Sequence, residues 1–223
     1  MNKKTLLVGL SVLAVMFVGV AVLIAILYGG DGVKDGKPQV RKSEALFCAV
    51  PSNAVAVARF ADVKTASEKV LSLDVHPAKG RGGFGKAVAD AVAAGRLPEL
   101  SANALAVSLQ YSKNLVPLYV FDAGRAGDTE NDAEVNLIAT LASEAGLSFN
   151  DCDCSKILSV TQELRGRRLL LVSPADNIVN SSLRHLNDGV SIYDSNGFAA
   201  AASGVSASSS LFISVSAADQ ILP

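Results

Sequence analysis

Residues 104–122 read ALAVSLQYSKNLVPLYVFD, and this stretch decides the fold class. In the segment 104–111, larger apolar residues alternate with small or polar ones, which is typical of a β-strand whose two faces differ. A second apolar run, LVPLYVFD, follows the short polar turn Ser112-Lys113-Asn114, and two strands joined by so short a turn pair antiparallel. The stretch therefore predicts a β-hairpin. Pro117 cannot donate a ladder hydrogen bond, so it is expected at a strand end or at an edge of the sheet.

Strand and helix patterns continue on both sides of this hairpin. Residues 54–60 (AVAVARF) predict a buried strand, and apolar residues at helical spacing follow over 63–71. Asn131 and Glu134 have the spacing of a capping box at the start of a later helix. We therefore predict an α+β body with helices packed on a mostly antiparallel sheet. The other predicted elements are helices over 84–94, 132–145 and 174–186 and strands over 157–164, 168–172 and 211–215.

An uncharged apolar stretch precedes this body, at residues 5–28 (TLLVGLSVLAVMFVGVAVLIAILY). As a helix with a rise of about 1.5 Å per residue, it is long enough to cross a hydrocarbon core of about 30 Å. A cleavable signal peptide has an apolar core of only about 7–15 residues and small residues at its cleavage site, whereas this stretch ends in Ile26, Leu27 and Tyr28. We therefore predict that residues 1–28 are a retained transmembrane anchor whose residues 5–28 contact the lipid bilayer.

Residues 29–42 (GGDGVKDGKPQVRK) are rich in glycine and charge, and they predict a flexible linker before a folded domain at 43–223. Lys3 and Lys4 precede the anchor, and the basic residues of the linker are diluted by two aspartates. A short basic head of this kind usually stays in the cytoplasm. The sequence therefore predicts a single-pass protein of the inner (cytoplasmic) membrane with its body outside the cytoplasm.

Composition argues against nucleic acid as a partner. The chain carries 20 Lys and Arg residues, two of them before the anchor, against 21 Asp and Glu residues. Such a balance provides no basic stripe that would neutralise the phosphates of a nucleic acid. The chain has no Trp and only 5% aromatic residues, so stacking platforms for single strands are scarce too. Neither a nucleic-acid partner nor a cofactor is expected.

One stretch carries a recognisable chemical motif. Residues 80–87 (GRGGFGKA) fit the phosphate-binding loop G-x-x-x-x-G-K and the dinucleotide motif G-x-G-x-x-G. Gly80, Gly85 and Lys86 are therefore a candidate anion-binding loop, and Asp122, at the end of an apolar run, resembles the acid that helps to hold magnesium. Against this interpretation, the next residue is an alanine where the motif has a metal-binding hydroxyl, and no buried strand leads directly into Gly80. Nucleotide or phosphate binding is the alternative function.

The local sequence contains no recognisable catalytic motif. There is no G-x-S-x-G, and neither His76 nor His185 has a serine or cysteine partner at a recognisable spacing. The three cysteines leave several alternatives open: a disulfide between Cys48 and either Cys152 or Cys154, a metal site, or free thiols. A metal site normally needs a second pair of ligands, so none is predicted. We expect no catalytic residue, and a non-enzymatic protein is favoured.

An Ala-Asp pair recurs between a strand pattern and a helical pattern, at residues 61–62, 175–176 and 218–219. An Asp in the first turn of a helix accepts hydrogen bonds from unpaired amides at the positive end of the helix dipole, so a structural capping role is predicted. The third pair is followed by only a few residues, up to Pro223. Our hypothesis is that a second copy of the opening unit begins near Gly204 and that the body is truncated at its C-terminus.

Residues 51–62 (PSNAVAVARFAD) place a proline before a short apolar strand that leads into the first Ala-Asp pair. Together with the N-terminal apolar stretch and the polar linker, this layout resembles a loose group of uncharacterised bacterial envelope proteins. The resemblance implies an extracytoplasmic body and assigns no catalytic residue. We therefore predict a non-enzymatic binding or assembly module of the bacterial envelope, with an envelope protein as its partner.

Overall fold

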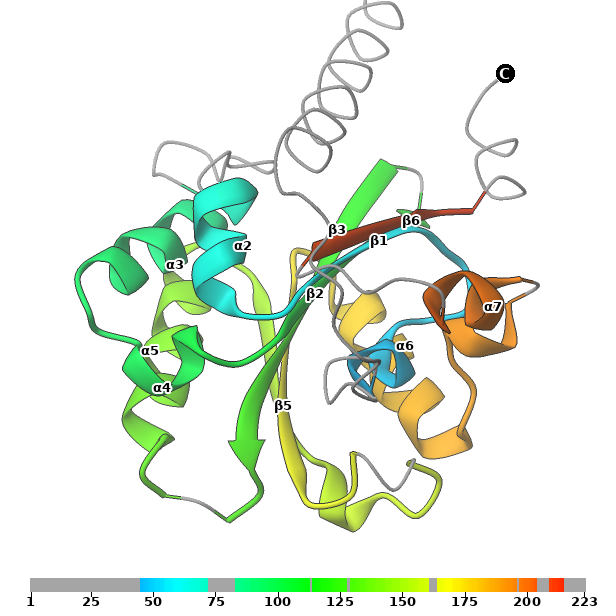
Figure 1. The fold of residues 1–223 in the computed structure, drawn as a ribbon. Helices are drawn as coiled ribbons and strands as arrows, with labels where there is room; N and C mark the ends of the chain where they lie inside the picture. Colours follow the sequence, from blue (N-terminus) through cyan, green and yellow to red (C-terminus); the bar gives the residue numbers. More distant parts are fainter. Residues whose placement is uncertain are drawn as a thin grey trace, which may run out of the picture. The chain divides into compact units, whose positions relative to one another are not determined.

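The computed structural model describes residues 45–71, 83–112, 114–127, 129–160, 164–195, 197–203 and 209–214. Within these residues, a six-stranded sheet lies between two layers of helices (Figure 1). The strands are β1 (Ala54–Phe60), β2 (Leu105–Ser112), β3 (Asn114–Arg125), β4 (Ser148–Asp153), β5 (Arg167–Ser173) and β6 (Ser209–Ile213). The α-helices are α2 (Val63–Lys69), α3 (Phe84–Ala93), α4 (Pro98–Ser101), α5 (Asp132–Glu144), α6 (Asp176–Asp188) and α7 (Phe198–Ser203). Short 3-10 helices are η1 (Ala45–Ala49), η3 (Cys154–Lys156) and η4 (Ile192–Asp194).

Every strand pairing in this sheet is antiparallel, and the strand order is β4-β5-β3-β2-β1-β6. The predicted hairpin is formed by β2 and β3, whose pairing runs from Ser112 opposite Asn114 to Leu105 opposite Phe121. β3 is an interior strand, but its pairing with β5 begins only at Tyr119. Pro117 lies before that point, where β3 pairs with β2 and not with β5, so it occupies a local edge of the sheet. The predicted α+β class with an antiparallel sheet is therefore confirmed for the described residues.

One face of the sheet is covered by α2, α3, α4 and α5 (Figure 1). Phe84, at the start of α3, packs edge-on against Tyr119 and Phe121 of β3, with ring centroids 5.3 and 6.2 Å apart. The helix presents Phe84, Val88 and Ala91 on one side, and all three are buried. The apolar stripe predicted for this helix is therefore the surface that docks α3 on the sheet.

The opposite face is covered by η1, α6, η4 and α7 (Figure 1). The hydroxyl of Ser182 in α6 donates to the carbonyl of Ala49, and the amide of Ile192 donates to the carbonyl of Val50 at 2.9 Å. These bonds hold η1 between the sheet and the second helical layer. The core on this side includes Leu46, Ala104, Ala106, Leu118, Val120, Leu169, Leu171, Ile178, Val179 and Leu186.

The prediction of a strand over 157–164 is wrong for the residues of this range that the structure describes. Residues 158–160 form a turn, and Leu158 is 93% exposed. The strand that pairs with β5 is β4, which lies earlier in the chain and has the sequence SFNDCD. This segment has no β-branched residue, so its strand conformation comes from pairing with β5 and not from local propensity.

Asn131 and Glu134 do not form the predicted capping box. Asn131 is the N-cap of α5, but its side chain makes no capping bond, and its Nδ2 donates to the carbonyl of Ala123 at 3.2 Å. The Glu134 carboxylate accepts hydrogen bonds from the amides of Glu99 and Leu100, at 3.0 and 2.7 Å. Glu134 therefore caps the first turn of α4, a neighbouring helix, because its side chain turns away from its own N-terminus.

The first two Ala-Asp pairs differ in structure. Asp62 is the N-cap of α2, and its carboxylate accepts from the amide of Thr65 at 2.6 Å, as predicted. Asp176 begins α6, but its carboxylate accepts from the hydroxyl of Ser148. The third pair, at 218–219, lies outside the described residues.

Other predictions also concern residues outside the described ranges. These are the transmembrane anchor at 1–28, the linker at 29–42, and Gly80 of the candidate anion loop. Within the ranges that are described, the helices are too short or too polar to cross a bilayer.

Candidate functional site

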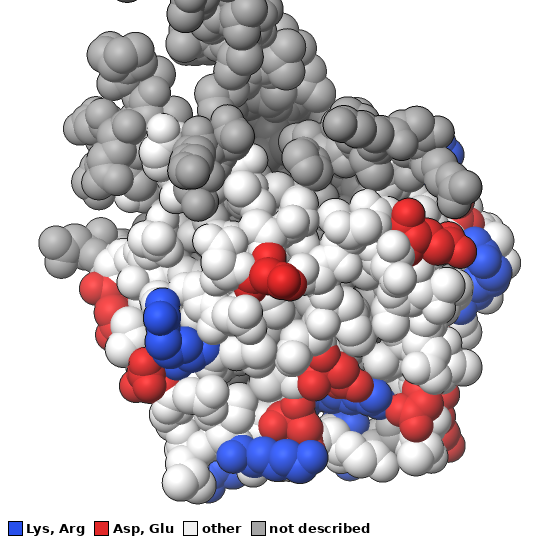
Figure 2. Space-filling model, turned by 180° about the vertical axis from the view of Figure 1, so that it is seen from behind, with Lys and Arg blue, Asp and Glu red and all other residues white. Residues whose placement is uncertain are grey.

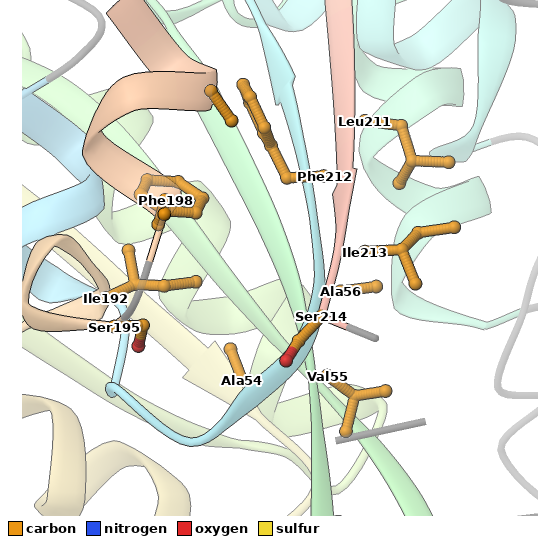
Figure 3. Close-up of a pocket in the computed structure, with 12 residues that line it drawn as sticks. Ala54, Val55, Ala56, Ile192, Ser195, Phe198, Leu211, Phe212, Ile213 and Ser214 are labelled. Atoms are coloured by element: carbon orange, nitrogen blue, oxygen red, sulfur yellow. The ribbon is translucent and has the colours of Figure 1, made fainter. Parts of the chain in front are cut away.

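A pocket of about 490 Å³ lies beside β6, between the edge of the sheet and the segment formed by η4 and α7 (Figure 3). None of its described lining residues is ionisable. The lining combines apolar side chains with Ser195 and Ser214, and its described residues offer no acid or base for proton transfer. The residues that line it are Ala54, Val55, Ala56, Ile192, Ser195, Gly197, Phe198, Ala201, Leu211, Phe212, Ile213 and Ser214.

An aromatic cluster supports one wall of this pocket. The ring of Phe198 lies 5.1 Å from that of Phe47 and 5.0 Å from that of Phe212, measured between centroids. Phe47 belongs to η1, Phe198 to α7 and Phe212 to β6, so three segments that are distant in sequence meet here. Large aromatic rings in contact stabilise such a junction well, and the wall is therefore fixed by the fold of the body.

Local hydrogen bonds position the segment that closes the pocket opposite β6. Ser191 is the N-cap of η4: its hydroxyl accepts from the amide of Tyr193 at 3.2 Å, and its own amide donates to the carboxylate of Asp194 at 2.7 Å. The hydroxyl of Ser195 then donates to the carbonyl of Ser52 at 2.7 Å. These bonds tie η4 to the turn before β1, so the pocket is bounded by elements with a defined geometry.

Among the described strands, β6 is an edge of the sheet whose own sequence carries none of the features that usually protect edge strands. It pairs with β1 on one side, and no described strand pairs with its other side. Its sequence, SSLFI, contains neither a charge nor a proline. The edge strand at the far end of the sheet, β4, carries Asp151 and Asp153. Charges and prolines normally prevent an edge strand from pairing with another chain, so β6 is the less protected edge of this sheet.

The two sides of β6 present different surfaces. Figure 3 shows Phe212 on the same side of the strand as Phe198, and Leu211 and Ile213 on the opposite side. Ile213 is 48% exposed, although large apolar residues of this kind are usually buried. The edge of β6 therefore lies between the aromatic wall on one side and an exposed isoleucine on the other.

Gly85 of the candidate anion loop has a packing role in the structure. It is buried near the N-terminus of α3, and a Cβ atom added to it would lie 2.7 Å from the carbonyl oxygen of Leu71. Contacts this short to a backbone atom essentially do not occur, so only glycine allows α3 to approach the end of α2 so closely. This packing role was not predictable from the motif.

The two charged residues of the phosphate-loop interpretation have partners in separate parts of the body. Lys86 donates to the carboxylate of Asp90 at 2.7 Å, one turn further along the exposed side of α3. Asp122 is buried in β3, where it is paired with Arg167 of β5. Asp122 pairs in register with Leu169, which belongs to the core on the η1 and α6 side, whereas α3 lies on the other face of the sheet. The structure therefore gives Lys86 and Asp122 separate ion pairs.

The three cysteines gather around one core cluster, and none of them forms a disulfide. Cys152 and Cys154 are buried members of the cluster, and Cys48 packs against it. The Cys154 thiol donates a hydrogen bond to the Cys152 sulfur, which lowers the pKa of Cys152, whereas that bond and burial raise the pKa of Cys154. Within the part of the chain that is described, no three His, Cys, Asp or Glu side chains are placed to hold a metal ion.

Charged side chains on the surface form mixed pairs. Arg168 of β5 contacts both Asp151 of β4 and Asp132 at the start of α5, and these carboxylates raise the pKa of its guanidinium. Figure 2 shows Lys and Arg interspersed with Asp and Glu on the face seen there, without a broad area of one sign. These charges connect neighbouring elements of the body.

His185, the described one of the two histidines, lies on α6. Its Nδ1 is buried and has no hydrogen-bond partner among the described residues. Burial, and secondly the charge of Arg184, lower the pKa of the imidazole, while Asp188 and Asp194 oppose this shift. No cysteine or serine nucleophile is paired with it among the described hydrogen bonds, so we assign it no catalytic role.

Sequence reasoning missed the pocket residues because they come from weak local signals. Phe198 begins a short alanine-rich helix, and Ser195 lies in a connection without a motif. The available signal was the uncharged strand SSLFI, which is unusual for a sheet edge. Comparisons of the chain with protein-family models, with curated proteins and with solved structures found no match.

Proposed function

We propose that this chain is a membrane-anchored extracytoplasmic domain that acts as a non-enzymatic binding or assembly module of the bacterial envelope. The apolar stretch at 5–28 is of the length and character of a transmembrane helix, and a polar linker separates it from the body. The resemblance of the layout to envelope proteins supports the same location. In this proposal the anchor holds the body at the inner membrane, where it meets its partner.

The observation that carries the binding role is the combination of a weakly protected edge strand with an adjacent pocket. β6 has no charge or proline, and the pocket beside it has about 490 Å³, within the range of about 300–1,000 Å³ that is typical of ligand sites. An extended peptide that pairs with a sheet edge gains affinity from main-chain hydrogen bonds and specificity from pockets for alternate side chains. In this proposal, the edge of β6 provides the main-chain hydrogen bonds and the adjacent pocket accepts a side chain.

The ligand class that fits this arrangement is an extended, mostly apolar segment of another envelope protein. Its backbone would pair with the side of β6 that faces away from β1, and one of its side chains would enter the pocket against Phe198 and Phe212. Alternate side chains of the same segment would lie on the side of Ile213, whose exposed surface would then be covered. The absence of ionisable lining residues favours an apolar side chain over a charged one.

Site-specific photocross-linking in intact cells tests this proposal. A photoreactive side chain at Ile213 is compared with one at Leu158, which is 93% exposed and lies beyond β4, away from β6 in the sheet order. We expect a discrete cross-linked envelope protein from position 213 only. Ala201→Phe, which fills the pocket, should abolish the product, whereas Ala93→Phe, on an exposed position of α3, should leave it unchanged. Equal cross-linking from both positions, or a product unaffected by Ala201→Phe, would contradict the proposed site.

The alternative function is nucleotide or phosphate binding by the loop at Gly80–Lys86. One observation favours it: the N-cap of α3 is Gly83, whose lack of a side chain leaves the first amides of the helix without a side-chain cap. Wild type and Lys86→Ala are compared for a thermal shift on adding ATP with magnesium. A magnesium-dependent shift that disappears in the variant would support this alternative, and identical melting curves with and without ATP would exclude it.

A further inference from the structure

The hairpin of β2 and β3 carries apolar side chains on the side of the sheet that faces α3. Tyr119 lies on this side, because it packs against Phe84 of α3. Directly opposite residues of an antiparallel pair point to the same side of a sheet, and so do alternate residues of one strand. From Tyr119, the registers therefore place a further set of side chains on this side. We call this set the apolar sheet face, and its members are Ala56, Val107, Leu109, Tyr111, Leu115 and Ile213.

Burial decreases along this face towards the turn of the hairpin. In β2, Leu105 is fully buried, Leu109 is half-buried and Tyr111 is 45% exposed. Ile213 is 48% exposed at the same end of the sheet, because Ala56 of β1 pairs with Leu109 on one side and with Ile213 on the other. Figure 3 shows the side chains of Ala56 and Ile213 on the same side of the sheet. Four neighbouring strands therefore share one partly exposed apolar surface.

The end of β2 reverses the usual distribution of polar and apolar residues. Ser108 and Gln110 alternate with Leu109 and Tyr111, and it is these two polar residues that are buried. Gln110 Nε2 donates to Ser108 Oγ at 3.1 Å, so they satisfy part of their hydrogen-bonding capacity with each other. In an antiparallel sheet with one face in water, polar side chains normally point to the water. The reversal favours an apolar environment beside the apolar sheet face.

The exposed part of this face is small for an interface between two proteins. Only Tyr111 and Ile213 are close to half exposed, and the other members are half-buried. A stable protein complex typically buries about 800 Å² on each partner and has a polar rim. The members of the face offer one polar group, the Tyr111 hydroxyl. Lipid chains need neither a matched shape nor hydrogen-bond partners, and Tyr is a preferred residue at the membrane–water interface.

The length of chain before the body brings this face within reach of a bilayer. Sixteen residues, 29–44, separate the predicted anchor from η1. At about 3.3–3.6 Å per residue, they span at most roughly 55 Å. A short tether holds the body near the membrane at a high effective concentration, so a weak contact is sufficient to orient it. The face therefore does not need to hold the body on the membrane by itself.

We infer that the apolar sheet face lies against the lipid surface of the membrane that holds the anchor, with the Tyr111 hydroxyl at the level of the headgroups. This inference rests on the anchored location in the proposed function, and it adds an orientation of the body. β6 lies at the border of the face, because Ile213 belongs to both. The apolar segment proposed to pair with β6 therefore meets it at the membrane surface.

Single-tryptophan fluorescence tests the inference, because the chain has no Trp of its own. The full-length variants Tyr111→Trp and Leu158→Trp are reconstituted into vesicles of phosphatidylcholine and phosphatidylglycerol, with or without bromine atoms on the acyl chains. Leu158 is the control because it is exposed and lies beyond β4, away from β6 in the sheet order. We expect emission from position 111 to shift to shorter wavelength in vesicles and to lose intensity when the lipid is brominated. Emission from position 158 should do neither.

A pair of aspartate substitutions tests whether the rest of the face takes part. In the Tyr111→Trp background, Ile213→Asp places a charge on the face and should restore part of the intensity in brominated vesicles. Val190→Asp introduces the same charge at a similarly exposed aliphatic residue, which follows α6 on the opposite side of the sheet. It should leave the quenching unchanged. Equal quenching in the two Asp variants would overturn the inference.

Vesicle flotation separates failure of this inference from failure of the proposed function. A chain that does not float with the vesicles would contradict the anchor, and the inference would fall with it. A chain that floats, but whose emission from position 111 is quenched no more than that from position 158, would overturn only the lipid contact. Emission that is shifted to shorter wavelength but not quenched would show instead that protein, either a second copy or a partner, covers the face.

Discussion

Replacing Glu134 with alanine should destabilise the body, because this one carboxylate caps a neighbouring helix. Its two oxygens accept from the amides of Glu99 and Leu100, at 3.0 and 2.7 Å, and the side chain is buried. These amides belong to the first turn of α4, where no preceding carbonyl of the helix can accept from them. The variant Glu134→Ala removes both acceptors and leaves the donors in place.

The magnitude follows from the environment of each bond. A hydrogen bond to a charged group contributes about 1.5–3 kcal/mol where it is buried, as at Leu100, and less where water can replace it, as at the exposed Glu99. We therefore expect Glu134→Ala to lower the free energy of unfolding by about 2–4 kcal/mol. For a body of this size, a loss of about 3 kcal/mol corresponds to a fall in Tm of roughly 6–12 °C. Glu134→Gln keeps one acceptor oxygen and should fall between wild type and Glu134→Ala.

Urea unfolding of the two Glu134 variants is compared with that of Glu144→Ala. Glu144 ends the same helix and is exposed, so its removal should change the free energy of unfolding by less than about 0.5 kcal/mol. The slope of free energy against urea concentration should be the same for all four proteins. A Glu134→Ala variant as stable as Glu144→Ala would refute the assignment of Glu134 as the cap of α4.

Two further predictions concern α3 and α6. Gly85→Ala should lower the free energy of unfolding by about 1–3 kcal/mol, because the added Cβ would meet the Leu71 carbonyl. Lys86→Ala, at the neighbouring position, should have little effect. Equal urea midpoints for the two variants would contradict the close packing of α3. His185 has a lowered pKa in the folded state, so the unfolded chain binds more protons than the folded chain at acid pH. The stability contributed by neutral His185 is then complete above the unfolded pKa of about 6.5 and is lost as pH falls below it. His185→Gln should reduce the loss of stability between about pH 7.5 and pH 5, and an unchanged pH profile would show that other groups cause it.

The sequence predicted those elements whose periodicity agrees with their packing. The hairpin of β2 and β3, the strand β1 and the helix α3 all follow from alternation or from an apolar stripe at helical spacing. Their residues are buried as the patterns indicate, because each pattern matches the face that meets the sheet or a helical layer. Asp62 as an N-cap was predictable for the same reason, since its partner Thr65 is local.

The features that were missed depend on contacts between distant segments. β4 has no β-branched residue and is held by β5, so no strand was predicted over 148–153. Glu134 has the spacing of a local cap but contacts a helix that ends about 30 residues earlier in the chain. The pocket needs η1, α7 and β6 together, and no local pattern reveals such a junction.

Membrane topology tests the central claim most directly. Alkaline phosphatase, which is active only outside the cytoplasm, and green fluorescent protein are fused separately after Pro223 of the full chain and expressed in bacteria. A body outside the cytoplasm, held by the anchor at 5–28, predicts high phosphatase activity in the membrane fraction and no fluorescence. Fluorescence without phosphatase activity would contradict an extracytoplasmic binding module.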